Sequence, residues 1–392
     1  MAESRRTPFA APRAARGRSL RAPPFAALLF VLIALAACAS PRQGALVPVA
    51  AAPPGSARVA MLVATTRERT DAPGVLFTGE RGEGVSYQDI VVSVPPQRDV
   101  GSVRWGAGDP TRDFSVLSET ALAQKDFLRA LARLTPRSGR VLVFIHGYNV
   151  GFETAVFHFA QLTHDMNGGF APILFSWPSR GRLLDYVYDR ESANFSRTDL
   201  ADVLRAVVRN PGVKDVVVIA HSMGAWLATE SLRQMALEDG RVPKKISNLI
   251  LASPDLDLDV FRRQVQEMGP ERPLITVFVS RNDKALRVSS LLAGGIARVG
   301  AIDLTDPDKI AELESARGVV VLDLTALRTS DRLNHSKFST SPEVVRLLGD
   351  RLIAGRGLSG ADGDLVTAAD AIGGAVSRVA LTPIVLFAGG GN

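Results

Sequence analysis

The sequence contains little cysteine, little histidine and few aromatic residues. Its 392 residues include 1 Cys, 5 His and 6% aromatic residues. One Cys cannot form an internal disulfide, and metal or redox sites built on paired cysteines are excluded. With 46% hydrophobic and 22% charged residues, the composition also excludes a disordered chain, a collagen-like repeat and a small disulfide-stapled protein. A chain of this length can bury a large core.

Basic residues exceed acidic ones only at the N-terminus. The formal net charge is +6, from 46 Lys and Arg against 40 Asp and Glu, and residues 1–37 contain six Arg and one Glu. Outside this segment, 40 basic and 39 acidic residues remain, so the rest of the chain is nearly neutral. We therefore expect no nucleic-acid partner, because such binding depends on a basic surface.

The basic segment is followed by an apolar run over residues 25–37. A basic start and a short apolar run are typical of a secretory signal, and the run is short for a membrane span. It ends in Leu35-Ala-Ala-Cys38, which resembles the bacterial lipobox, in which the Cys is acylated and becomes the new N-terminus. The resemblance implies an exported lipoprotein held on a membrane through Cys38, and Ala39 is compatible with the periplasmic side of an outer membrane. An uncleaved anchor is the alternative.

The chain divides into four parts. We predict a lipoprotein signal peptide at 1–37, an Ala/Pro-rich tether at 38–57, a folded domain at 58–355 and a Gly/Ala-rich tail at 356–392. The tail is predicted to be loosely docked, with a membrane or partner contact as the alternative.

The folded part alternates strands and helices. Apolar, β-branched runs predict eight strands, at Arg58–Thr66, Tyr87–Val94, Arg140–Ile145, Ala171–Trp177, Asp215–Ala220, Ile246–Ala252, Leu274–Ser280 and Gly318–Leu324. Helices are predicted at Ser118–Leu134, Phe152–Met166, Ser196–Arg209, Met223–Glu238, Leu258–Met268 and Ser341–Ala354, and Pro95–Ser118 is predicted to be a loop. This pattern indicates a mostly parallel sheet covered on both faces, with ligands bound at the carboxyl ends of the strands.

A serine follows one of these strands at a sharp turn. Ala220-His-Ser222-Met-Gly224 joins a predicted strand to a predicted helix, and it resembles the G-x-S-x-G nucleophile elbow of the α/β hydrolases, with Ala220 in place of the first Gly. Small residues are needed there because the backbones of strand and helix pass close to the serine. Ser222 is the candidate nucleophile, and the Met223 N–H is a candidate oxyanion donor. The alternative role for Ser222 is a helix N-cap.

The other members of the site follow from the same resemblance. The family places His-Gly after an earlier strand, here His146-Gly147, and takes the second oxyanion N–H from the next residue, Tyr148. His146 would shape this loop, and an ordinary strand-to-helix turn is the alternative. The family order along the chain is Ser, acid, His. His335 is the one His that follows Ser222, and His221 is expected to point elsewhere.

Two aspartates compete for the role of the acid. Asp283 follows the predicted strand at Leu274–Ser280, which is the family's usual position, whereas Asp255 follows the preceding strand. We favour Asp283. The losing Asp would be a helix N-cap or a loop carboxylate.

Several further segments resemble one branch of the superfamily, the bacterial domain of unknown function DUF900. They include Val63-Ala-Thr-Thr-Arg67, Phe144-Ile-His-Gly-Tyr-Asn149, Phe175-Ser-Trp-Pro-Ser179 and Asn282-Asp-Lys-Ala-Leu286. The resemblance implies an α/β-hydrolase fold with about eight strands and no large cap domain, and a Ser-His-Asp hydrolase that needs no metal or organic cofactor. We expect a small-molecule ester or acyl substrate.

The free segment from Pro178 to Ser196, with Trp177 and Tyr186, is expected to line the substrate pocket. Two alternatives to an esterase remain open. One is a serine amidase, peptidase or acyltransferase with the same triad, and the other is a non-catalytic surface lipoprotein that uses the fold for binding.

Overall fold

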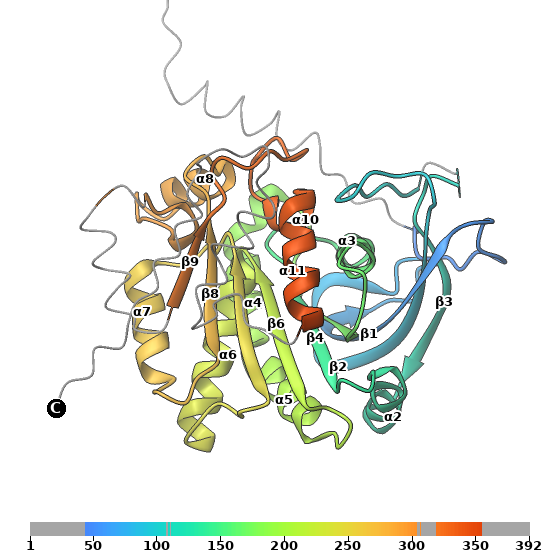
Figure 1. Cartoon of the computed structure of the whole chain (residues 1–392), viewed down its shortest axis with the longest axis horizontal. Helices are drawn as coiled ribbons and strands as arrows, with labels where there is room; N and C mark the ends of the chain where they lie inside the picture. Colours follow the sequence, from blue (N-terminus) through green and yellow to red (C-terminus); the bar gives the residue numbers. More distant parts are fainter. Residues whose placement is uncertain (1–43, 107–108, 110, 304–305, 307–318, 355–392) are drawn as a thin grey trace, which may run out of the picture. The chain divides into compact units, whose positions relative to one another are not determined.

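Nine strands form one sheet, and helices pack on both of its faces (Figure 1). The computed structural model describes residues 44–354 apart from 107, 108, 110, 304, 305 and 307–318, and the statements on structure concern these residues. The described residues belong to one compact unit.

Seven of the strands run parallel to their neighbours. In chain order the strands are β1 (Ala57–Arg69), β2 (Phe77–Val94), β3 (Ser115–Leu122), β4 (Arg140–Ile145), β5 (Ala171–Ser176), β6 (Asp215–His221), β7 (Ile246–Ala252), β8 (Leu274–Val279) and β9 (Val319–Asp323). Their order in the sheet is β3-β2-β1-β5-β4-β6-β7-β8-β9. In this sheet order, every neighbouring pair after β1 is parallel, starting with β1 and β5 and ending with β8 and β9. Strand β2 is antiparallel to both β1 and β3. The parallel strands therefore end at a common carboxyl edge, where open α/β sheets bind ligands.

The helices connect these strands. They are α2 (Gln124–Leu134), α3 (Phe152–Asp165), α4 (Tyr186–Phe195), α5 (Arg197–Arg209), α6 (Met223–Asp239), α7 (Leu258–Glu267), α8 (Lys284–Leu292), α10 (Lys337–Thr340) and α11 (Pro342–Ala354), with short 3-10 turns η1 (Leu183–Asp185) and η2 (Val299–Ala301). The connection between β7 and β8 contains α7 and no inserted cap domain.

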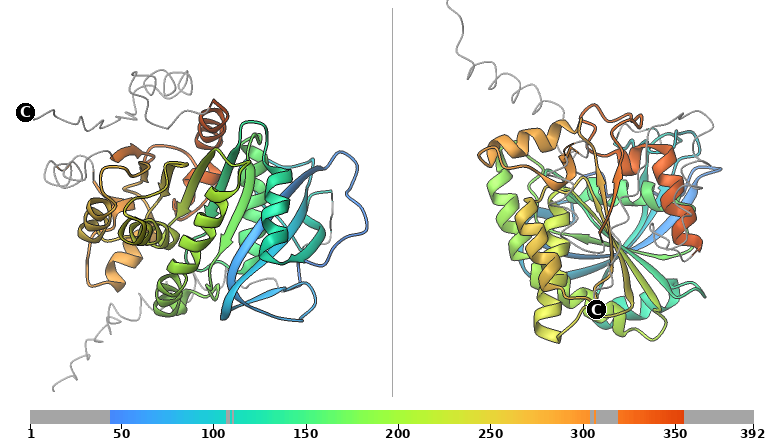
Figure 2. Two further views of the ribbon diagram at one scale, coloured as in Figure 1. Left: turned by 90° about the horizontal axis from the view of Figure 1, so that it is seen from below. Right: turned by 60° about the vertical axis from the view of Figure 1, so that its left-hand side comes forward.

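Two hydrophobic cores lie on opposite faces of the sheet. One contains apolar residues of α2, α4, α5, α6 and α7, and the other contains residues of α3, α10 and α11. The strands supply both, because successive side chains point to opposite faces: Val143 of β4 belongs to the first core and Phe144 to the second. The right panel of Figure 2 shows α11, in red, and the yellow-green helices on opposite sides of the strands.

The predicted α/β-hydrolase fold is confirmed, and all eight predicted strands are present. One element was assigned wrongly. Strand β3 covers Ser115–Leu122. Its first residues were predicted as the end of a loop, and residues 118–122 were predicted as the start of a helix. They pair with β2, where Ile90 lies opposite Glu119, and the helix begins only at Gln124. Pairing with a distant strand overrides the local helical preference there.

Three α-helices among the described residues were not predicted. The segment from Pro178 to Ser196, to which no helix or strand was assigned, contains η1 and α4. Helix α8, which follows Asp283, and the short helix α10, which follows His335, were also missed.

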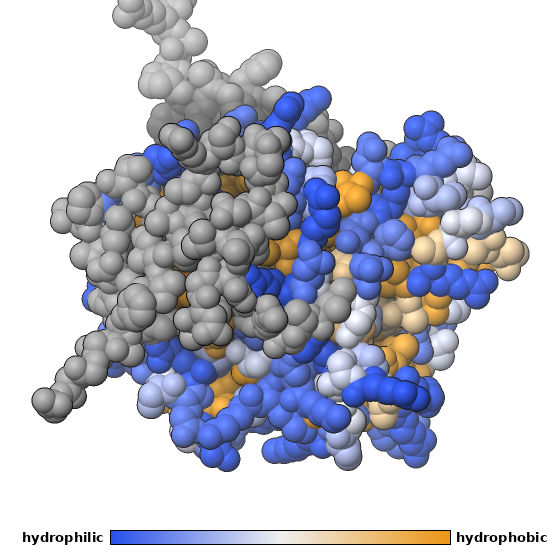
Figure 3. All heavy atoms as spheres, viewed as in Figure 1, coloured by the Kyte–Doolittle hydropathy of each residue, from blue (hydrophilic) through white to orange (hydrophobic). Residues whose placement is uncertain are grey.

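The surface in view is mainly polar. The described side chains visible in Figure 3 are mostly hydrophilic, with hydrophobic residues in smaller groups between them. None of the helices in the described part of the chain is long and apolar enough to cross a bilayer.

Candidate active site

Ser222 lies in the turn between β6 and α6. Its backbone has φ 53° and ψ −121°, a conformation that residues with a side chain rarely adopt and that costs about 1–3 kcal/mol. Its N–H donates to the carbonyl of Ala252 at 2.9 Å, and its carbonyl accepts from the N–H of Asp255 at 3.1 Å. Ser222 stands at the N-cap position of α6, but its side chain makes no capping bond to the helix, so side-chain capping does not account for this serine. The backbone matches the strained turn that presents a serine oxygen in the α/β hydrolases.

Small residues let the elbow lie directly against the end of β4. A Cβ built on Gly224 would overlap the carbonyl oxygen of His146 and lie 2.9 Å from that of Ile145. A Cβ on Gly147 would lie 2.9 Å from the Cβ of Ser222. The loop after β4 and the elbow are therefore in close contact, and glycine is required on both sides of it.

His335 and Asp283 form a hydrogen-bonded pair. His335 Nδ1 donates to Asp283 Oδ2 at 2.7 Å, and the Asp283 side chain has no exposed surface. The other carboxylate oxygen of Asp283 accepts the N–H of Leu286 at 3.0 Å, so Asp283 also caps α8. Because Nδ1 carries the hydrogen in the neutral ring, Nε2 is left as the acceptor.

The surroundings of His335 favour its protonated form. Burial of the imidazole lowers its pKa, but the charge of Asp283 and its hydrogen bond oppose this effect, with smaller contributions from Asp255 and Asp331. The balance raises the pKa of His335 above its ordinary value of 6.5. A nearby carboxylate has this effect because it stabilises the charged imidazolium.

His221 lies beside His335, although the sequence interpretation had it pointing elsewhere. The two ring centroids are 4.6 Å apart, and His221 Nε2 lies 3.2 Å from the carbonyl oxygen of His335. Burial, followed by the charge of His335, lowers the pKa of His221 well below its ordinary value. A neutral His221, which directly precedes Ser222, therefore holds the His335 loop beside the turn.

His335 contacts His221, the neighbour of Ser222 in the chain, but makes no direct hydrogen bond to the Ser222 side chain. Within the described residues, no hydrogen bond joins the Ser222 hydroxyl to the His335 ring, whose side chain keeps 15% of its surface exposed. Bonds between nucleophile and base are often loose in the absence of substrate and tighten when it binds.

Two charged residues that the sequence interpretation missed hold the His335 loop. The carboxylate of Asp331 accepts the backbone N–H groups of His335 at 2.7 Å and Ser336 at 2.8 Å. Lys337, which is 1% exposed, donates to Asn282 Oδ1 at 2.9 Å and to the carbonyls of Leu324 and Thr325. The loop that carries His335 is thereby tied to the loop that carries Asp283. Asp331 lay in the polar segment around His335, which was the one available signal.

The loop after β4 carries Tyr148. His146, at its start, is buried, and its Nδ1 donates to the carbonyl of Gly147 at 2.8 Å. Burial, with the nearby charge of Arg67, lowers the pKa of His146 to about 3, so the ring is neutral and shapes the loop. Asn149, which follows Tyr148, has φ 60°, and this left-handed residue turns the chain away from the elbow.

Trp177 does not line an open pocket, contrary to the prediction. Its side chain has no exposed surface, its Nε1 donates to the carbonyl of His146 at 2.8 Å, and its ring stacks on that of His146 at 5.0 Å. Trp177 follows β5, which lies directly beside β4, and so it packs underneath the loop that carries Tyr148. It supports the loop from the core.

Tyr186 reaches the other candidate acid. Its hydroxyl donates to Asp255 Oδ2 at 3.1 Å and lies 3.1 Å from Ser289 Oγ, and its ring meets that of Tyr148 edge-on at 5.2 Å. Asp255 Oδ1 also accepts a hydrogen bond from Ser289 Oγ at 2.5 Å and forms an ion pair with Arg298 Nε at 3.1 Å. The carboxylate of Asp255 is therefore engaged away from His335, and the geometry favours Asp283 as the partner of the histidine.

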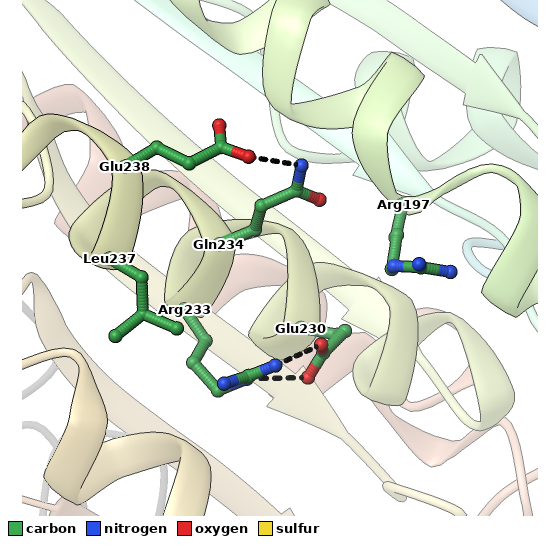
Figure 4. A pocket seen from close by; sticks show the side chains of 6 residues that line it. All are labelled: Arg197, Glu230, Arg233, Gln234, Leu237 and Glu238. Carbon is green, nitrogen blue, oxygen red and sulfur yellow. Dashed lines mark hydrogen bonds and ion pairs between the residues drawn. The ribbon is translucent and has the colours of Figure 1, made fainter.

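A hollow of about 280 Å³ lies along α6, beginning about two turns beyond Ser222. Its lining residues, shown in Figure 4, are Arg197, Glu230, Arg233, Gln234, Leu237 and Glu238. Glu230 and Arg233 form a salt bridge of 2.7 Å, and Arg197 and Glu238 add one charge of each sign to the lining. Among the described residues, no group of three or more His, Cys, Asp or Glu could hold a metal ion.

Cys38 and the tail at 356–392 lie outside the described residues.

The parallel sheet, the strained serine after β6 and the His-Asp pair beyond it define an α/β hydrolase. The chain belongs to the family described as alpha/beta hydrolase of unknown function (DUF900), whose model matches residues 120–351. The match includes the segments that carry Tyr148, Ser222, Asp283 and His335.

More distant similarities were found in both sequence and structure. An uncharacterized protein of Nostoc sp. is 26% identical over 275 residues, which cover 52% of this chain and 71% of that protein. Among solved structures, carboxyl esterase 2 of the fungus Tuber melanosporum gives a TM-score of 0.36 at 11% identity, covering 84% of this chain and 98% of that one. An esterase of Pyrobaculum calidifontis gives 0.33 at 13% identity, covering 68% and 81%. TM-scores of this size indicate only a distant likeness.

Proposed function

We propose that this hydrolase cleaves carboxylic esters with Ser222 as the nucleophile, His335 as the base and Asp283 as the acid. The observation that carries the proposal is the positive φ of Ser222, in a turn packed against the loop of Tyr148. Such strain persists only where the surroundings enforce it, and it clusters at functional sites. The 2.7 Å bond between His335 and Asp283 supports the assignment of the other two residues.

The proposed reaction runs in two steps. The Ser222 oxygen attacks the ester carbonyl while its proton passes to His335 Nε2, and the N–H groups of Tyr148 and Met223 stabilise the oxyanion. The bond to the alcohol then breaks, the alcohol leaves with the proton from His335, and the acyl group remains on Ser222. In the second step a water molecule, deprotonated by His335, releases the carboxylic acid and restores the serine.

An apolar acyl group fits the surroundings of the site. Tyr148 and Tyr186 pack edge to face there. On either side of Tyr186 in the chain, Leu184 of η1 is 85% exposed and Val187 of α4 is 75% exposed. Exposed apolar side chains near a site favour an apolar ligand over a charged one. Amide cleavage by the same triad is the competing activity.

A fluorophosphonate probe tests the nucleophile directly. We expect covalent labelling of Ser222 in the folded wild-type chain, no labelling of Ser222→Ala, and no ester turnover by that variant, with nearly the same melting temperature. Unlabelled wild-type protein, or turnover retained by Ser222→Ala, would overturn the assignment. A panel of p-nitrophenyl esters and matched anilides then separates esterase from amidase activity, and anilides cleaved faster than esters would contradict the proposal.

We also propose that the enzyme is an exported lipoprotein whose anchor is Cys38. The proposal is supported by the basic start, the apolar run over residues 25–37 and the position of the single Cys of the chain at its end. Acyl chains on Cys38, followed by the tether at 38–57, would keep the hydrolase at the membrane surface.

A further inference from the structure

Arg67 is a fully buried cation at the carboxyl edge of the sheet. It lies near the end of β1, beyond the point where Thr65 pairs with Ser176 of β5, and only 1% of its surface is exposed. Burial lowers its pKa to about 10, while the charges of Asp189 and Glu153 act in the opposite direction. Arg67 is therefore charged at neutral pH. A buried charge is costly unless its surroundings pair every donor.

The guanidinium of Arg67 joins the segments that follow β4 and β5. It donates to Ser176 Oγ at 2.8 Å and to the carbonyl of Ser179 at 2.8 Å, both at or after the end of β5. In the loop after β4 it donates to the carbonyl of Val150 at 2.7 Å and lies 3.3 Å from His146 Nε2. A further bond to the carbonyl of Thr78, at 3.1 Å, ties it to β2.

Asp189 of α4 holds the same two segments from another side. Its side chain is fully buried, and it accepts the N–H of Asn149 at 3.2 Å, the Ser179 hydroxyl at 2.5 Å and the N–H of Arg180 at 3.0 Å. The N–H of Val150 donates to Ser179 Oγ at 3.0 Å and completes the connection.

Tyr148 lies between the residues that this network holds. His146 precedes it and is fixed by Arg67, Ser176 and Trp177. Asn149 and Val150 follow it and are fixed by Asp189, Ser179 and Arg67. The residues on both sides of the Tyr148 peptide are therefore tied down by buried charged groups.

We propose that Arg67 and Asp189 are positioning residues that fix the Tyr148 N–H as an oxyanion donor. The inference rests on the proposed function, because it assigns a purpose to the Tyr148 amide. An oxyanion donor contributes only when it is held in place before the charge develops, since reorientation during the reaction would consume the benefit. Neither residue touches the substrate, so each acts through the loop.

Lysine cannot reproduce this arrangement at position 67. The guanidinium presents five N–H donors in a rigid planar fork, whereas an ammonium has three donors on a single atom. Arg67→Lys therefore keeps the charge and releases part of the network. Asp189→Asn keeps the shape and weakens the acceptors for Asn149 and Ser179.

Hydrogen exchange of the full-length chain measures the loop without relying on activity. We expect faster deuterium uptake over residues 146–151 in Arg67→Lys and Asp189→Asn, with unchanged uptake in α2. Arg140→Met is the matched control. Arg140 is also buried, but it pairs with Asp215 at 2.7 Å at the amino ends of β4 and β6, far along β4 from the Tyr148 loop.

Kinetics of the same variants test the link to the oxyanion. For a p-nitrophenyl ester we expect kcat to fall about 10²–10³-fold in Arg67→Lys with KM changed only a few-fold, as for loss of one oxyanion donor. The affinity for a trifluoromethyl ketone, whose adduct carries the same oxyanion, should fall by a similar factor, and Arg140→Met should keep both values.

Two results would overturn the inference. One is wild-type uptake, kcat and ketone affinity in both Arg67→Lys and Asp189→Asn. The other is an equal loss in Arg140→Met, which would show general destabilisation. Faster uptake in the two variants, combined with a wild-type Ser222 that resists fluorophosphonate, would instead refute the proposed function. The network of Arg67 and Asp189 would then be a feature of the fold alone.

Discussion

His335 Nδ1 lies 2.7 Å from Asp283 Oδ2, although 52 residues separate the two in the chain. The intervening chain contains α8 and β9, and β8 and β9 are parallel neighbours, so their carboxyl ends bring the two loops together. Asp255, the rival acid one strand earlier, instead accepts hydrogen bonds from Tyr186 and Ser289 and forms an ion pair with Arg298.

Exchange of the two aspartates for asparagine distinguishes their roles. Asp283→Asn should lower kcat about 10⁴-fold in a folded protein, because the amide no longer stabilises the imidazolium and the correct tautomer. Asp255→Asn should mainly lower stability, since it leaves the buried Arg298 without its charged partner, a loss of about 3–5 kcal/mol for a buried pair. Steady-state kinetics and thermal melts of both variants check this, and a greater loss of kcat in folded Asp255→Asn would reverse the assignment.

The raised pKa of His335 predicts the acidic limb of the pH profile. The base must be neutral, so kcat/KM should rise with pH through an apparent pKa above the ordinary value of 6.5. In Asp283→Asn the burial of the ring remains while the opposing charge is lost, so the limb should move to lower pH. A profile of kcat/KM between pH 5 and pH 9, roughly the range in which histidine titrates, measures both. An unchanged limb in Asp283→Asn would contradict the pairing.

Gly224→Ala tests the close approach of the elbow to β4. The added Cβ would overlap the carbonyl oxygen of His146, and backbone cannot move aside as a flexible side chain can. We expect the free energy of unfolding to fall by about 1–3 kcal/mol, as for overpacked sites, together with a loss of turnover. Gly84→Ala is the control, because nothing lies within 4 Å of the added Cβ there. Equal denaturant midpoints for the two variants would show that the elbow accommodates the added Cβ without loss of stability.

Cys38→Ser tests the anchor. Growth with an alkyne-labelled fatty acid should label the wild-type chain and Ser40→Ala, and should not label Cys38→Ser, because the acyl chains attach to the cysteine sulfur and the new N-terminus. The protein should also move from the membrane fraction to the soluble fraction. Label that persists in Cys38→Ser would remove the lipoprotein proposal.

The local sequence pattern predicted strand positions reliably where the strand is buried on both of its faces. The strands β4 to β8 are continuous apolar runs, and each was predicted to within a residue or two. The elbow could be predicted for a related reason, because a serine flanked by small residues between a buried strand and a helix leaves few alternatives. Strand β3 was missed because its pattern is that of an edge strand, only partly buried, and its pairing with β2 is a distant contact.

The sequence by itself determined the chemistry available at the carboxyl edge: one serine at a turn, one late histidine and two candidate aspartates. The tertiary structure places Asp283, and not Asp255, within hydrogen-bond distance of His335 Nδ1, because that contact depends on which loop ends beside the His335 ring. It also decided that Trp177 is a core residue and that Arg67 and Asp189 surround the Tyr148 loop. Those roles arise from contacts between β1, the loop after β4 and the segment from the end of β5 into α4. These three parts lie far apart in the chain, so their contacts leave no local pattern. Which of these segments lie side by side depends on the order of the strands in the sheet, where β1 is the neighbour of β5.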